Sequence, residues 1–148
     1  MFKHLLVPID GSELSQAALE QACAFARETD ARLTCYYAKP TYLPYGMAAE
    51  GVFDFAAASE VYRAAMDKRA ETILSHAKQV ATEAGVVFEA ITTECDEPDE
   101  GIIATAESCG CDLIFMASHG RRGARALMLG SETQKVLTHC KIPVLVTR

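Results

Sequence analysis

The residues best suited to chemistry lie between a predicted strand and a predicted helix near the C-terminal end of the chain. Residues 113–116 form a continuous apolar run, which is typical of a strand buried on both faces. Gly120 and Gly123 follow among three arginines, and Gly130-Ser131-Glu132-Thr133 then opens a helix. Glycines let the backbone approach a ligand closely, and the amides and dipole of a helix N-terminus attract anions. We therefore predict a phosphate site, with the hydroxyls of Ser131 and Thr133 directed at negative oxygens.

A plainer interpretation of the same residues is possible. Gly120 and Gly123 would then be ordinary turn residues, and Ser131 would only cap the helix. The residue types do not separate the two interpretations, so the spacing of these residues along the chain must decide.

The spacing favours the ligand site. Gly120, nine further residues and then Gly130-Ser131, all after an apolar strand, resemble the nucleotide loop of the universal stress protein family, Gly-x2-Gly-x9-Gly-Ser/Thr. Ala117 stands at the first glycine of that pattern. Its methyl group costs about 1 kcal/mol if the residue needs a positive φ, and almost nothing if φ is negative. The sequence leaves both cases open.

A second candidate site residue lies near the N-terminus. Residues 3–8 read as a buried strand ending at Pro8, and Ser12 is the predicted N-cap of a helix that runs to about residue 28. Asp10 lies between them, at the strand end where open α/β sheets bind ligands, and in the family an aspartate here contacts the nucleotide. The alternative is a turn-forming aspartate beside Gly11. We expect the core face of this helix to contain Leu14, Ala18, Ala22 and Phe25.

The middle of the chain continues the alternation. Residues 32–38 are predicted as a strand, and the resemblance implies that the backbone near Tyr37 and Ala38 meets adenine. Residues 41–58 form a long irregular connection, which could be a lid, a partner surface or a seal on the core. A helix is predicted over 59–84, ended by Gly85, and its core stripe is expected to contain Met66, Ala70, Ile73, Ala77, Val80 and Ala84.

The remaining predicted elements complete a repeating pattern. We expect a strand over 86–91, followed by a helix that is capped by Asp96 and has Pro98 in its first turn. The apolar strand over 113–116, a helix over 132–139 and a last strand over 144–146 complete the chain. This order predicts one α/β domain over residues 1–148, a doubly wound parallel sheet of five strands with helices on both faces. The resemblance implies the sheet order 3-2-1-4-5, like that of the adenine nucleotide alpha hydrolases. Asp10 would then bound a crevice opposite Gly120 and Gly130.

The composition excludes several other functions. A net charge of −6 and a pI near 5.2 argue against nucleic acid as a partner. No apolar run reaches the roughly 20 residues that a membrane span needs. The six cysteines show no zinc spacing and follow no secretory leader, so we expect free thiols, a cytoplasmic location and no metal held by side chains alone.

The resemblance implies a protein that binds ATP, or ADP or AMP, with Mg²⁺ carried by the phosphates. Binding, with slow or absent hydrolysis, would signal stress to a protein partner that the sequence does not identify. Family members commonly pair two-fold through the last strand, which predicts a homodimer through the apolar edge Val144, Leu145 and Val146. The implied contact residues are Pro8, Ile9, Asp10, Tyr37, Ala38, Met116, Ala117, Gly120, Arg121, Gly130, Ser131, Glu132 and Thr133.

Two other functions remain open at this stage. The first is an ATPase or phosphotransferase, in which His119 or Glu132 would position water and Arg121 would neutralise developing charge. No Gly-Lys-Ser/Thr phosphate loop supports it. The second is an interaction protein of the same fold whose nucleotide site stays vacant, and Ala117 is its main support.

Overall fold

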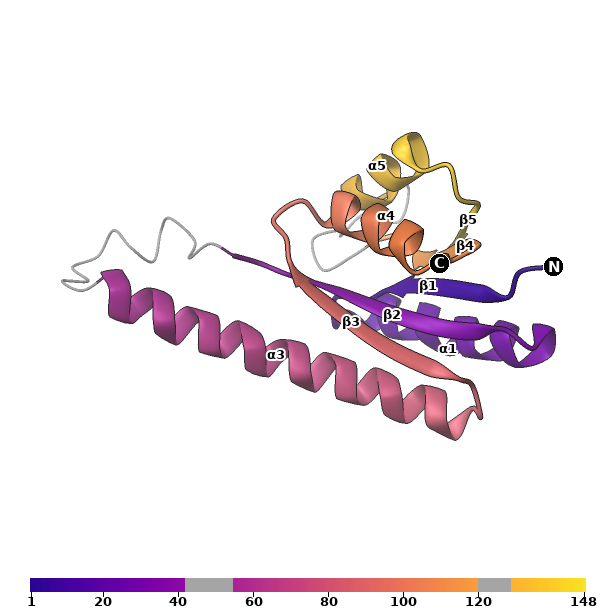
Figure 1. Cartoon of the computed structure of the whole chain (residues 1–148), viewed down its shortest axis with the longest axis horizontal. Helices are drawn as coiled ribbons and strands as arrows, with labels where there is room; N and C mark the ends of the chain where they lie inside the picture. The colour runs from indigo at the N-terminus through magenta and orange to yellow at the C-terminus, as the bar shows by residue number, and fades with distance from the viewer. Residues whose placement is uncertain (42–54, 120–128) are drawn as a thin grey trace.

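Strands and helices alternate around one parallel sheet in the computed structural model, which describes residues 1–41, 55–119 and 129–148 (Figure 1). The described elements are β1 (His4–Pro8), α1 (Glu13–Thr29), β2 (Arg32–Lys39), α3 (Phe55–Glu83), β3 (Phe88–Glu94), α4 (Pro98–Ser108), β4 (Leu113–Ala117), α5 (Ser131–His139) and β5 (Val144–Thr147). Most of the predicted 41–58 connection lies outside the described residues, and α3 begins inside its last part.

The strand order over the described residues is β3-β2-β1-β4-β5, which confirms the predicted doubly wound sheet of five strands. All four strand pairs are parallel. Every residue of β4 is buried, as expected for a continuous apolar strand at the centre of a sheet covered on both faces. The chain enters the sheet at its centre, extends to β3 on one side, and then crosses to β4 and β5 on the other.

The two faces of the sheet have separate cores. Helices α1 and α3 cover one face, and α4 and α5 cover the other (Figure 1). Neighbouring residues of β1 show the alternation expected of a strand, because Leu5 packs in the first core and Leu6 in the second. The first core also contains Leu19, Leu33, Ala77 and Phe115, and the second contains Tyr36, Ile102, Ile114 and Val136.

Helix α1 begins as predicted but turns a different face to the sheet. Ser12 is its N-cap, and the Ser12 Oγ accepts a hydrogen bond from the Ser15 amide at 3.2 Å. Ala18 and Ala22 are buried as expected, but Leu14 is 37% exposed. The buried stripe instead includes Leu19 and Cys23. The prediction for Leu14 was wrong because the helix meets the sheet along a stripe centred on the small alanines.

Helix α3 confirms the predicted alanine stripe, and it starts four residues earlier than expected. Ala70 and Ala77 are buried, together with Ala81, which the prediction did not include. Gly85 has a φ of +71°, and the Val86 amide donates to the Ala81 carbonyl at 3.0 Å. These are features of a left-handed helix cap, as predicted.

Strand β3 begins and ends later than the predicted range of 86–91. Val86 takes part in the turn that closes α3, and the ladder with β2 then continues to Lys39 and Glu94. The prediction ended with the apolar run. Because β3 is an edge strand with a largely exposed surface, polar residues such as Thr92 and Thr93 can extend it.

The cysteines and helices of the described chain bear on two expectations. All six cysteines are free thiols, as predicted. Within the described residues, none of the helices has the length and apolar character needed to span a bilayer.

A buried polar group lies at the N-terminal edge of the sheet. His4 is 5% exposed, and its Nε2 lies 2.7 Å from Thr34 Oγ1 on the neighbouring strand. The Asp112 carboxylate accepts hydrogen bonds from the Lys3 amide at 2.8 Å and the His4 amide at 3.0 Å, which ties the starts of β1 and β4 together. Burial lowers the pKa of His4 below its ordinary 6.5, and Arg32 lowers it further.

The neutral imidazole of His4 should make folding pH-dependent. Because the pKa of His4 is lower in the folded protein, the unfolded chain binds more protons below about pH 6.5. The free energy of unfolding should therefore fall as the pH drops through 6.5, and level off below the folded pKa. Urea denaturation of wild type and His4→Gln between pH 7.5 and 5 measures this. The variant should lose part of the pH dependence, and identical pH profiles would contradict the prediction.

Candidate functional site

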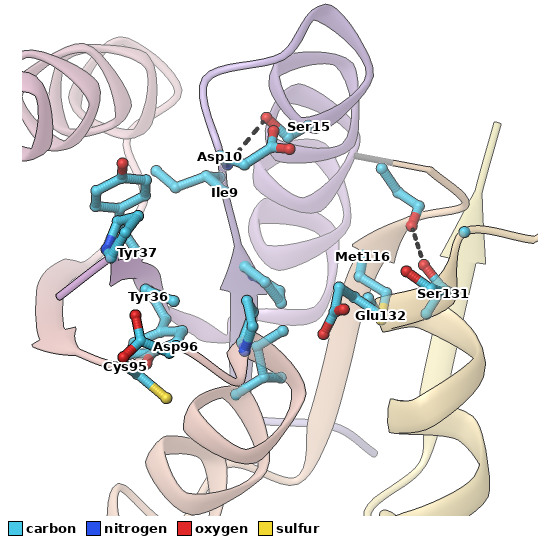
Figure 2. Close-up of a pocket in the computed structure, with 18 of the residues that line it drawn as sticks. Ile9, Asp10, Ser15, Tyr36, Tyr37, Cys95, Asp96, Met116, Ser131 and Glu132 are labelled. Carbon is cyan, nitrogen blue, oxygen red and sulfur yellow. Dashed lines mark hydrogen bonds between the residues drawn. The ribbon is translucent and has the colours of Figure 1, made fainter. Parts of the chain in front are cut away.

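A cavity of about 810 Å³ opens at the C-terminal edge of the sheet, where the ends of β1 and β4 lie side by side (Figure 2). Every implied contact residue that the structure describes lines it. Gly120 and Arg121 lie outside the described residues, as do Gly123, Arg122 and Arg125. The lining comprises Pro8, Ile9, Asp10, Ser15, Tyr36, Tyr37, Ala38, Pro40, Tyr62, Met66, Arg69, Cys95, Asp96, Pro98, Ile102, Met116, Ala117, His119, Gly130, Ser131, Glu132 and Thr133.

The turn after β1 holds Asp10 at the mouth of this cavity. The Asp10 Oδ1 accepts a hydrogen bond from the Ser12 amide at 2.9 Å, and the Asp10 amide donates to Ser15 Oγ at 3.4 Å (Figure 2). Gly11 completes the turn with a φ of +80°, a conformation that favours glycine. Asp10 is therefore both a turn-forming residue and a cavity residue, so the two interpretations from the sequence are compatible.

The backbone at Ala117 removes one objection to a ligand here. Among the described residues, Asp30 is the only non-glycine residue with a positive φ, and Ala117 is the last residue of β4. Ala117 therefore has a negative φ, and the methyl group costs almost nothing in backbone strain. Of the two cases that the sequence left open, the structure shows the one in which alanine in place of the family glycine costs almost no free energy.

The start of α5 is bonded to the end of β4. The Gly130 amide donates to the Ser118 carbonyl at 2.8 Å, and the Thr133 Oγ1 donates to the Ala117 carbonyl at 3.1 Å. The expectation that the Thr133 hydroxyl points at a ligand was therefore wrong. The hydroxyl is buried and fixes the helix to the strand instead.

The first amides of α5 remain suited to an anion. Gly130 occupies the N-cap position, so Ser131 begins the helix rather than capping it. The first hydrogen bond within this turn runs from the Gln134 amide to the Gly130 carbonyl at 3.0 Å. The amides of Ser131, Glu132 and Thr133 thus precede the helix's own hydrogen-bond series. Ser131 is exposed and lines the cavity, as a phosphate contact would require.

Glu132 lies in the cavity wall but also joins two helices. Its Oε2 accepts a hydrogen bond from the Asp99 amide at 3.2 Å, at the start of α4, and its Oε1 lies 3.5 Å from Lys135 Nζ. Lys135 also pairs with Asp99 and Glu97. A carboxylate held in this way is a poor candidate for positioning an attacking water.

Helix α3 contributes cavity residues that the sequence did not indicate as site residues. Tyr62, Met66 and Arg69 come from one face of α3, four and then three residues apart. Met66 was predicted as core, and it is half-buried at the cavity. The helical periodicity marked this face as inward-facing, but it could not show where α3 passes beyond the edge of the sheet.

The β3–α4 connection supplies the part of the cavity wall near Tyr37 and Ala38. Asp96 lines the cavity there but does not cap α4 as predicted. Glu97 is at the cap position, and its side chain makes no cap hydrogen bond. The Asp96 carboxylate instead accepts hydrogen bonds from the amide and hydroxyl of Thr41.

The comparisons with known proteins agree with this geometry. A family model described as "Universal stress protein family" matches residues 1–148. The chain belongs to this family. Over 149 residues it is 34% identical to universal stress protein YxiE of Bacillus subtilis, covering all of both chains.

Solved universal stress proteins share the fold. UspA of Lactobacillus plantarum superimposes with a TM-score of 0.79 at 25% identity, over 99% of this chain and 98% of the other. The Archaeoglobus fulgidus universal stress protein in complex with dAMP has a TM-score of 0.65 at 17% identity, over 100% and 98% of the two chains. A universal stress protein in complex with cAMP has a TM-score of 0.66 at 22% identity, over 99% and 97%.

Helix α4 packs closely against Tyr36 of β2 at Gly101. The Tyr36 Oη, 2.7 Å from Thr93 Oγ1, lies where a side chain on Gly101 would begin. Tyr36 is 1% exposed, and burial raises the pKa of its phenol, so the group stays protonated near neutral pH within a packed site. Glycine at 101 is therefore a packing requirement.

Gly101→Ala should destabilise the protein by about 1–3 kcal/mol, because the methyl overlaps Tyr36 Oη. Helix propensity alone predicts the opposite sign, a gain of about 1 kcal/mol. Urea denaturation measures the change. Tyr36→Phe removes the overlapping oxygen, so the double variant should recover part of the loss. A Gly101→Ala protein more stable than wild type would show that the overlap is relieved.

Proposed function

We propose that this universal stress protein binds an adenine nucleotide, ATP or a shorter phosphate form, in the cavity at the C-terminal edge of its sheet. Adenine would lie against Tyr37 and Ala38, and ribose near Asp10. The phosphates would lie at Gly130 and Ser131, with Gly120 and Arg121 completing the loop. Pro8, Ile9, Met116 and Ala117 would line the space between.

The observation that carries the proposal is the position of the cavity. At about 810 Å³ it falls in the range of small-molecule sites, roughly 300–1,000 Å³. It lies at the point where β1 and β4 are neighbours but lead to helices on opposite faces, which is where open α/β sheets bind ligands. The complexes of related folds with dAMP and cAMP support the same ligand class.

The output that fits this site is binding rather than turnover. Glu132 is bonded to the start of α4, which makes it a poor group for positioning water. The His119 Nδ1 lies 3.0 Å from Ser118 Oγ, whereas its Nε2 is buried without a hydrogen-bond partner among the described residues. A bound nucleotide would order its surroundings and change what a partner protein meets, in the cytoplasm, as part of a stress response. Mg²⁺ would arrive with the phosphates.

The two alternatives make different measurable claims. An ATPase would release phosphate from ATP at a rate that depends on enzyme concentration. An interaction protein with a vacant site would neither bind nor hydrolyse ATP. Calorimetric titration and a phosphate-release assay on the same preparation separate all three.

Gly130→Asp should weaken ATP binding at least tenfold, because it places a carboxylate among the amides proposed to hold phosphate. The backbone tolerates the change. Gly130 has a φ of −61° and lies at the cap of α5, where Asp and Asn are both favoured. Gly130→Asn is therefore the matched control, of equal size without the charge. Titration calorimetry compares the two, and equal binding by the aspartate variant and wild type would refute the loop assignment.

We also propose a homodimer through β5. This strand is the last in the sheet order, pairs with β4 on one side, and is half-buried along its length. Such an apolar edge is normally paired or covered.

Light scattering at micromolar concentration should therefore give twice the chain mass of 16.0 kDa. Val146→Lys should shift the population toward monomer, because a charge on an edge strand opposes pairing. Circular dichroism would check that the variant is folded. A wild-type protein that is monomeric across the concentration range would contradict the dimer.

A further inference from the structure

Helix α3 brings a cation to the proposed nucleotide site. Arg69 lines the cavity together with Tyr62 and Met66 from the same helix face. Its Nη2 lies 4.0 Å from the position that a Cβ at Gly11 would occupy, so the guanidinium is beside the turn that holds Asp10. Arg69 is thus on the β1–α1 side of the cavity.

Arg69 lacks a protein partner within the described part of the chain. No ion pair or hydrogen bond to its guanidinium is found there, and its Nε is buried without a hydrogen-bond partner. Lys39 and Lys135, by contrast, each pair with carboxylates. Burying part of a guanidinium without a partner is unfavourable, so the group is suited to an anion that enters from outside.

The carboxylates that line the cavity repel an anion, so a phosphate there needs a cation beside it. Three carboxylates, those of Asp10, Asp96 and Glu132, line the cavity, and Arg69 is the only lysine or arginine among the described lining residues. The phosphates of a nucleotide would add negative charge to this acidic cavity. A guanidinium offers several donors in one plane, the geometry that matches phosphate oxygens.

We propose that Arg69 reaches from the Gly11 side of the cavity to one phosphate group of the nucleotide, while Gly130 and Ser131 bind the phosphates from the other side. The site would therefore prefer nucleotides over nucleosides. The inference rests on the proposed function. It adds a specificity residue from α3, outside the glycine-containing loop. The competing role is stacking of the guanidinium on adenine, which would favour nucleotides and nucleosides equally.

The test compares ATP with adenosine in Arg69→Gln. Affinity for ATP is measured by calorimetry and affinity for adenosine by ligand-observed NMR, which reaches millimolar dissociation constants. Arg69→Gln should weaken ATP about ten- to hundredfold, the loss expected for a charge-assisted hydrogen bond, and leave adenosine unchanged. Arg63→Gln is the matched control, since Arg63 is an exposed arginine of the same helix outside the cavity lining, and it should bind ATP like wild type.

Arg69→Lys keeps the charge but loses the planar fork, so its ATP affinity should lie between wild type and Arg69→Gln. Thermal melts establish that each variant is folded. If Arg69→Gln does not fold, Arg69→Lys is compared with wild type instead. Equal loss of ATP and adenosine affinity would overturn the phosphate role. Unchanged ATP affinity in Arg69→Gln would overturn the inference while leaving the proposed function intact. Failure of wild type to bind ATP would remove both.

Discussion

The parallel pairing of β1 with β4 is the constraint on which the rest of the structure depends. The pairs Leu5–Leu113 and Leu6–Ile114 hold the two strands together at the centre of the sheet. The chain leaves β1 for α1 on one face and leaves β4 for α5 on the other. The described cavity lies at the edge of the sheet between these two strand ends.

The start of α5 faces the cavity and is held in place by hydrogen bonds. The Ser118 amide donates to the Thr147 carbonyl at 2.7 Å, and the Ser118 carbonyl accepts from the Gly130 amide at 2.8 Å. Thr133 adds a side-chain bond to the end of β4. Amides oriented before a ligand arrives lose less freedom on binding, which favours affinity.

The acidic residues around the cavity serve the structure as well as the site. Asp10 accepts from the turn amide of Ser12, Asp96 from Thr41, and Glu132 from the start of α4. Each carboxylate is fixed in place by a hydrogen bond, so the acidic lining keeps its shape. A ligand that carries phosphate must therefore be matched by cationic groups and helix amides.

The sequence by itself determined the order of the elements, the continuous apolar strands, the Ser12 cap, the Gly85 stop and the strand ends at which a site would form. These follow from local patterns of burial and capping, while the strand order came from the family resemblance. Only the tertiary structure decided that the Thr133 hydroxyl faces backbone carbonyls, that Ala117 has a negative φ, and that Arg69 faces the cavity. The stripe on α3 is continuous in sequence, but its C-terminal part packs on the sheet and its N-terminal part passes the sheet edge. Periodicity records that a face is turned inward, whereas the neighbour it meets depends on elements far away in the chain.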